Sequence, residues 1–156
     1  MRIQRPLVFM AFALVMSVSL GLAASETFTA KLVGSDEVPA VQTSGKGEVV
    51  FKLSADNKSM TYKLKVRELE NITAAHIHSG MKGENGPPVA GLFAGPKKED
   101  AFSGELAKGT ITEKDLIGPL TGKTLSDLVA MIKSGRAYVN VHTVQSPGGE
   151  MRGQLK

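Results

Sequence analysis

The sequence predicts an all-β domain: an antiparallel β-sandwich with a Greek-key-like strand order and one or two short connecting helices. From Glu26 onward, apolar residues mostly recur with a period of two, which is typical of half-buried strands. The candidate strands also follow one another directly, whereas an α/β fold would alternate them with helices. The 132 residues that follow Ala24 are enough for one domain of this kind.

Residues 1–24 are predicted to be a secretory signal peptide. Arg2 and Arg5 precede an apolar run that ends near Leu22, and small residues close the segment at Ala24. A retained membrane anchor is the alternative, but the run contains two serines and is short for the ~20 apolar residues of a spanning helix. We therefore expect a periplasmic or secreted protein with no stable membrane span, whose single domain comprises residues 25–156.

The period-two pattern and the turn residues divide this domain into strands. The segment SGMKGENGPP, with three glycines and two prolines, is predicted to be a loop. The expected strands are one around Phe28 and Leu32, a hairpin of GEVVFKL and SMTYKLKV across residues 54–58, one over residues 71–78, two in PVAGLF and AFSGELAKGTI, and a terminal hairpin of RAYVNVHT and GEMRGQLK across residues 145–149.

One segment departs from this pattern. Residues 124–132 carry apolar residues at helical spacing, with Thr124 as an N-cap and Asp127 three residues later. Gly135 supplies a stop signal. A helix is therefore predicted here, and the shorter segment ITEKDL is predicted to form a second, single-turn helix.

Charge and cysteine content exclude several classes of protein. Without the predicted signal peptide, 17 basic residues stand against 15 acidic ones, which gives a net charge of +2. The lysines are scattered and tryptophan is absent, so the sequence does not indicate nucleic-acid binding. Cysteine is also absent, which excludes disulfides and thiolate sites. Export without disulfides favours a bacterial protein.

The chain holds only three histidines, and two of them lie one residue apart in AAHIHSG. Residues two apart on a strand project to the same face, so His76 and His78 point the same way. In YVNVHT the same periodicity places Tyr138, Asn140 and His142 on one face. If the two strands are neighbours, the three imidazoles converge.

Three converging imidazoles suit copper or zinc, which bind imidazole nitrogen at about 2 Å, and leave a fourth coordination position. Weaker candidates for that position are Glu150, across the last hairpin from His142, and Met81 or Met60 for Cu(I). Methionines commonly fill gaps in a core, and Glu150 could instead form an ion pair with Arg152. The alternative interpretation makes the histidines an exposed polar face and His142 a structural residue bonded to a loop carbonyl.

The sequence carries no complete catalytic set. It has no G-x-S-x-G motif, no P-loop lysine and no paired carboxylates typical of a hydrolase. A non-enzymatic role is therefore favoured, and the one enzymatic alternative is copper or zinc chemistry at an open coordination position.

Two blocks of the sequence, AAHIHSGMKGENGPPVAGLF and GRAYVNVHTVQSPGGEMRGQL, resemble the CHRD domain, a module of chordin that also occurs in many bacterial exported proteins. The resemblance covers essentially the whole chain after the predicted signal peptide and implies an extracellular, β-rich domain without a defined activity. The family-typical positions are His76, His78, Gly80, Asn85, Gly86, Pro87, Asn140, His142, Pro147, Gly148, Gly149, Glu150, Arg152, Gly153 and Gln154.

The His-x-His strand is also similar to that of copper-zinc superoxide dismutases, which are β-sandwiches, so we expect a superoxide-dismutase-like topology. Those enzymes need histidines for two metals and a stabilising disulfide. With three histidines and no cysteine, this chain departs from that pattern, and a dismutase of this kind is not expected.

The sequence thus predicts an exported protein that binds a transition metal, copper ahead of zinc, through His76, His78 and His142. Sequestration or delivery of the metal is the expected role, with Asn140 or Glu150 orienting an imidazole. The alternative is a structural module without metal that binds an extracellular or periplasmic protein or a polysaccharide.

Overall fold

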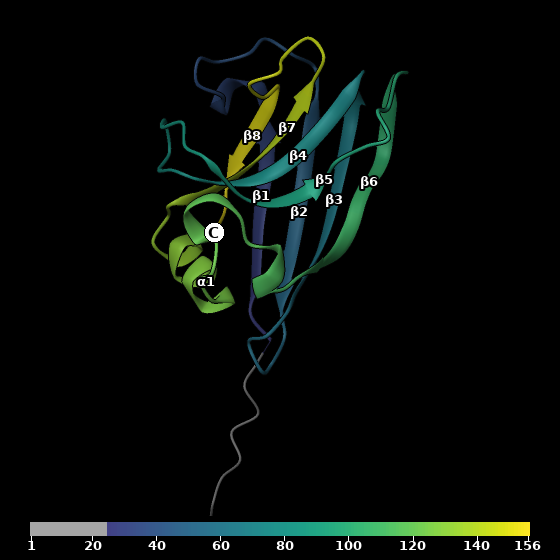
Figure 1. Cartoon of the computed structure of the whole chain (residues 1–156). Coiled ribbons are helices and arrows are strands. Elements are labelled where there is room, and N and C mark those ends of the chain that lie inside the picture. Colours follow the sequence, from purple (N-terminus) through teal and green to yellow (C-terminus); the bar gives the residue numbers. More distant parts are fainter. Residues whose placement is uncertain (1–24) are drawn as a thin grey trace, which may run out of the picture.

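The computed structural model describes residues 25–156, and the predicted signal peptide lies outside them. Eight antiparallel strands form one hydrogen-bonded sheet in the order β5-β4-β7-β8-β1-β2-β3-β6 (Figure 1). The all-β class is therefore confirmed. The strands are β1 (Thr27–Val33), β2 (Lys46–Leu53), β3 (Met60–Leu69), β4 (Ile72–Ser79), β5 (Pro88–Phe93), β6 (Phe102–Ile111), β7 (Ala137–Thr143) and β8 (Met151–Gln154).

Both helices that the sequence predicts begin with a capping box. Helix α1 (Leu125–Lys133) begins with a capping box, in which Thr124 and Asp127 satisfy each other's backbone N–H groups. The predicted single turn in ITEKDL is present as the 3-10 helix Glu113–Asp115. Two further 3-10 turns, Gly34–Asp36 and Gly118–Leu120, were not predicted, and neither begins with a side-chain cap.

The sheet folds back on itself, so that its inward faces enclose the core and the fold is sandwich-like. Inward-facing residues, which alternate with outward-facing ones along the strands, are fully buried, as at Phe51, Leu64 and Ile77. Near the open seam, the hydroxyl of Tyr62 on β3 donates to the Leu92 carbonyl on β5 at 2.7 Å. The edge strands β5 and β6 also contact each other there.

Strand β7 lies between β4 and β8, which makes the two histidine-bearing strands direct neighbours. The register sets His76 opposite Asn140 and His78 opposite Tyr138. On the other face of β7, Val139 and Val141 are fully buried in the core. The predicted division of faces is therefore present. Within residues 25–156, no helix is long and apolar enough to cross a membrane.

Candidate metal centre

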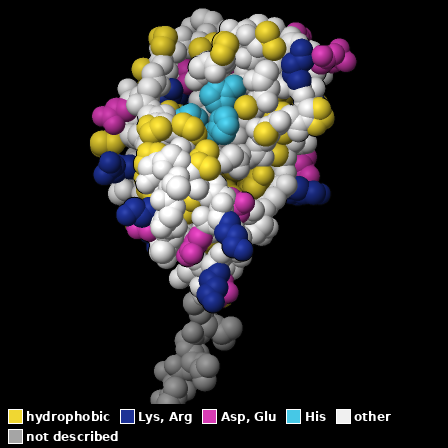
Figure 2. Space-filling model, in the orientation of Figure 1, with side chains coloured by type: hydrophobic (Ala, Val, Ile, Leu, Met, Phe, Trp, Pro, Cys, Tyr) yellow, Lys and Arg dark blue, Asp and Glu magenta, His cyan; other side chains and the backbone are white. Residues whose placement is uncertain are grey.

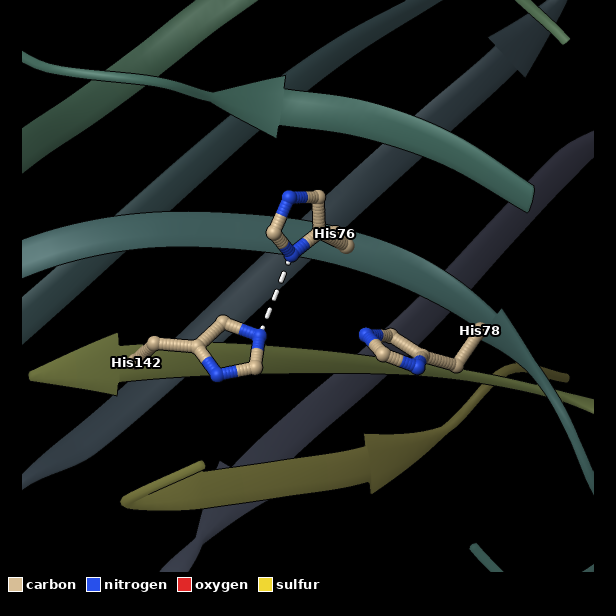
Figure 3. A group of neighbouring side chains, drawn as sticks. All are labelled: His76, His78 and His142. Carbon is tan, nitrogen blue, oxygen red and sulfur yellow. Dashed lines mark hydrogen bonds between the residues drawn. The ribbon is translucent and has the colours of Figure 1, made fainter. Parts of the chain in front are cut away.

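The three imidazoles converge on the outer face of β4 and β7 (Figure 3). His76 Nδ1 lies 3.1 Å from His142 Nε2, and one ring nitrogen from each histidine lies within 4.8 Å of the others. The ring centroid of His78 is 5.6 Å from that of His76 and 5.8 Å from that of His142. The two histidine motifs, far apart in the sequence, thus form one cluster.

Backbone carbonyls fix the protonation of two of these rings. His78 Nδ1 lies 2.8 Å from the Gly86 carbonyl, and His142 Nδ1 lies 2.9 Å from the Pro147 carbonyl. A carbonyl only accepts, so each Nδ1 carries a hydrogen and donates it. In the neutral ring, Nε2 then keeps its lone pair. His142 Nε2 faces His76, and His78 Nε2 is buried with no partner.

The spacing of the nitrogens is compatible with one metal ion. Two nitrogens bound to the same tetrahedral metal at about 2.0 Å are about 3.3 Å apart. The 3.1 Å between His76 Nδ1 and His142 Nε2 is close to this value. A ring nitrogen of His78 lies within 4.8 Å of the other two, and three imidazoles bound to one ion would need to close this spacing to about 3.3 Å.

The electrostatics of the cluster keep the imidazoles neutral. Burial, together with the neighbouring His142 and His78, lowers the pKa of His76 to about 4. Burial also lowers the pKa of His78 and of His142, although their bonds to the Gly86 and Pro147 carbonyls oppose the shift. Because a metal binds only the unprotonated nitrogen, a lowered pKa favours binding at neutral pH.

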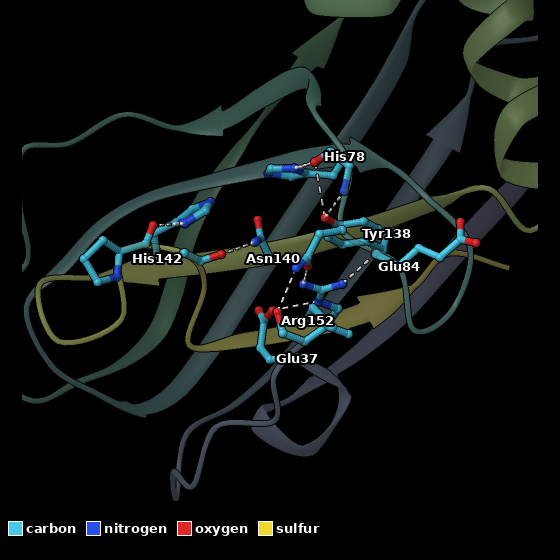
Figure 4. A network of polar contacts seen from close by, with 12 residues as sticks. Glu37, His78, Glu84, Tyr138, Asn140, His142 and Arg152 are labelled. Atoms are coloured by element: carbon cyan, nitrogen blue, oxygen red, sulfur yellow. Dashed lines mark hydrogen bonds and ion pairs between the residues drawn. The ribbon is translucent and has the colours of Figure 1, made fainter.

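Tyr138 supports His78 from the neighbouring strand. The two rings stack with centroids 5.1 Å apart and an interplanar angle of 18°. The Tyr138 hydroxyl accepts the Gly86 N–H at 3.2 Å, so Tyr138 also holds the residue whose carbonyl bonds His78. Figure 4 shows Tyr138 between His78 and Arg152, whose guanidinium lies 4.3 Å from the tyrosine ring centroid.

Arg152, which lies against the Tyr138 ring, also binds the loop before β5. Its Nε donates to Glu37 Oε2 at 2.7 Å, and both side chains are buried. The guanidinium also donates to the Glu84 carbonyl at 3.0 Å and to Asn85 Oδ1. Burial raises the pKa of Glu37, and the bond and charge of Arg152 oppose that shift. Arg152 therefore holds the loop that carries Gly86.

The weaker ligand candidates lie elsewhere. The Glu150 carboxylate accepts the hydroxyls of Thr43, at 2.7 Å, and of Thr143. Within the described chain, the only group of metal-ligating His or carboxylate side chains is the three histidines, so Glu150 is not part of it. Met81 is 53% exposed on the loop after β4, and Met60 is fully buried in the core.

Two support residues were not singled out from the sequence. Glu37 lies 115 residues from Arg152, and no local pattern connects them. Tyr138 was placed on the His142 face, but its stacking on His78 depends on the β4–β7 register. The alternative Glu150–Arg152 ion pair does not form, because Arg152 pairs with Glu37.

The cluster is open to solvent on one side. Figure 2 shows histidine side chains at the surface, with mostly uncharged side chains beside them and most of the lysines, arginines and carboxylates farther away on this face. An ion can therefore approach the imidazoles from this face without crossing a ring of fixed charge. A larger groove of about 630 Å³ over β1–β3 is lined by Lys31, Lys46, Lys65 and Arg67 and includes no histidine.

Comparison with known proteins gave one match. The family model described as the CHRD domain matches residues 28–155, nearly all of the chain that the structure describes. No curated protein and no solved structure matched the chain.

Proposed function

The chain belongs to the CHRD domain family, and from this premise and the geometry of its histidines we propose that it binds one transition-metal ion through His76, His78 and His142. The observation that carries the proposal is the pair of Nδ1 bonds to the Gly86 and Pro147 carbonyls. Histidines that bind a metal usually donate their other ring N–H in this way, which orients the ring.

Copper is the preferred ion, and zinc is the alternative. Imidazole nitrogen suits both metals, and copper(II) generally binds such sites more tightly than zinc does. The chain offers no thiolate that would favour another chemistry. In the exported compartment that the N-terminal sequence predicts, the protein would sequester the ion or deliver it to a partner.

A second candidate function rests on the same hydrogen bonds. His78 and His142 each bond a loop carbonyl, and these bonds could serve the fold alone, in a structural module that binds a protein or polysaccharide. This alternative expects His142→Ala to lower stability strongly, and expects no metal above background in the purified protein.

Titration of the metal-free protein with copper and with zinc distinguishes the two functions. We expect one ion per chain, and loss of tight binding in His76→Ala, His78→Ala and His142→Ala while circular dichroism shows that the variants remain folded. Met81→Ala is the matched control, because this side chain lies near the cluster in sequence but is exposed. Equal affinity in the parent and in His78→Ala would refute the proposal.

A further inference from the structure

A cavity of about 310 Å³ lies directly beside the histidine cluster. It opens between the segment after β1, the loop before β5 and the turn between β7 and β8, and its lining includes Glu37, His78, Tyr138, Ser146 and Gly149. We call it the His78 cavity. It is large enough for a small molecule or several waters.

The buried polar atoms without a partner gather around this cavity. Within residues 25–156, these atoms are Glu37 Oε1, His78 Nε2 and Asn140 Oδ1. Glu37 and His78 line the cavity themselves. A Cβ built on Gly149 would lie 2.5 Å from Glu37 Oε1 and 2.7 Å from Asn140 Nδ2, so a glycine here keeps space open between the carboxylate and the amide.

All three unpartnered atoms can accept a hydrogen bond. Asn140 Nδ2 donates to the Gly148 carbonyl at 3.4 Å, which fixes the amide orientation and leaves its oxygen free. Glu37 uses only Oε2 to bind Arg152. Figure 4 shows Asn140 between the histidines and Glu37. Buried acceptors of this kind usually bind a ligand or ordered water, because leaving them unpaired costs stability.

Three N–H donors around the cavity already have partners. Gly86 N–H donates to the Tyr138 hydroxyl, and Gly149 N–H donates to the Ser146 carbonyl. Asn85 Nδ2 donates to the Val38 carbonyl at 2.8 Å. An anion near Glu37 Oε1 and Asn140 Oδ1 would therefore meet oxygens with lone pairs rather than N–H groups.

Building on the proposed metal site, we propose that the His78 cavity binds a small neutral ligand with two ends. One end has a lone pair that fills the metal's open position beside His78 Nε2. The other end has an N–H or O–H group that donates to Glu37 Oε1 or Asn140 Oδ1. Neutral nitrogen heterocycles with one unprotonated ring nitrogen and one ring N–H have this chemistry, whereas simple anions do not.

Cobalt(II) is the probe metal, because its visible spectrum reports changes in coordination. The cobalt-loaded parent protein is titrated with imidazole, with 1-methylimidazole and with azide. Imidazole and 1-methylimidazole both offer a lone pair to the metal, but only imidazole offers an N–H at the far side. We expect imidazole to bind about tenfold more tightly than 1-methylimidazole, the effect of one hydrogen bond to a buried acceptor.

Glu37→Gln changes the acceptor at the cavity into a donor. The amide oxygen can keep the bond from Arg152 Nε, which places the NH₂ group where Glu37 Oε1 now lies. In this variant we expect the affinity for azide, relative to the affinity for imidazole, to rise about tenfold. Ser146→Ala is the matched control. It removes a hydroxyl from the same cavity and should keep the parent's preference for imidazole over 1-methylimidazole and azide.

The outcomes separate this inference from the metal site itself. If cobalt binds but the parent takes both imidazoles equally and Glu37→Gln changes nothing, the ligand site is refuted and the metal site stands. If none of cobalt, zinc and copper binds, both are refuted. If Glu37→Gln does not fold, the comparison of the two imidazoles on the parent protein decides.

Discussion

His76 Nδ1 lies 3.1 Å from His142 Nε2, although the two residues are 66 positions apart in the sequence. Direct pairing of β4 with β7 produces this contact, because it aligns the outward faces of both strands. His78 joins the pair from the same strand as His76. The bonds from His78 and His142 to backbone carbonyls then leave nitrogen lone pairs facing the centre of the cluster.

The first prediction concerns pH and stability without metal. The pKa of His76 is lowered from 6.5 to about 4 in the folded protein, so the unfolded chain binds more protons between these values. The free energy of unfolding should therefore fall as the pH falls from about 6.5 to about 4. Urea denaturation at several pH values measures it. Because carboxylates also titrate here, His76→Ala is the reference, and a slope identical to the parent's contradicts the prediction.

Tyr138 should affect metal affinity through His78. Tyr138→Leu removes both the stacking on His78 and the hydroxyl that accepts the Gly86 N–H. We expect about a tenfold loss of affinity, in the range found for residues that orient metal ligands. Tyr138→Phe keeps the stacking, so its metal affinity should fall less. Competition with a chromophoric chelator measures the affinity, and unchanged binding in Tyr138→Leu would contradict this role.

Arg152 and Glu37 form a buried ion pair, so removal of one partner should be costly. Arg152→Met leaves the Glu37 carboxylate buried without a cation, and we expect a loss of about 3 kcal/mol or more in the free energy of unfolding. The matched control is Lys133→Met, which removes the exposed Lys133–Glu26 pair and should cost less than about 1 kcal/mol. Chemical denaturation measures the free energy of unfolding. Similar losses in both variants would show that the buried Arg152–Glu37 pair does not stabilise the fold more than an exposed pair does.

Glu150 is predicted to stabilise the fold without binding the metal. Its carboxylate accepts hydroxyl hydrogens from Thr43 and Thr143. Glu150→Gln should lower the free energy of unfolding by about 1–3 kcal/mol, because one charged acceptor is lost. Metal affinity should remain that of the parent. A fall in affinity without a fall in stability would instead make Glu150 a ligand.

Local patterns in the sequence were enough to predict most secondary structure. Period-two runs predicted every strand, and the Thr124–Asp127 capping box predicted α1. The turns Gly34–Asp36 and Gly118–Leu120 were missed because no capping side chain marks them. Strand order could not be derived either, since the pairing of β4 with β7 depends on contacts between distant segments.

The same limit applies to the site. Spacing alone placed His76 and His78 on one face, and the convergence with His142 followed only if the strands were neighbours. The spacing of residues in the sequence does not predict that Arg152 pairs with Glu37 or that the Gly86 carbonyl bonds His78, because the fold brings these partners together. Glu150 was a reasonable ligand candidate from the hairpin, but its side chain bonds two threonines.

The most direct test of the metal site is ¹⁵N NMR of the histidine rings, recorded while zinc is added to the metal-free protein. The structure predicts that one equivalent of zinc shifts the resonances of His76 Nδ1, His78 Nε2 and His142 Nε2, and that Nδ1 of His78 and of His142 stays protonated. Imidazole resonances that remain unchanged at one equivalent of zinc, or binding through His78 Nδ1, would contradict the account.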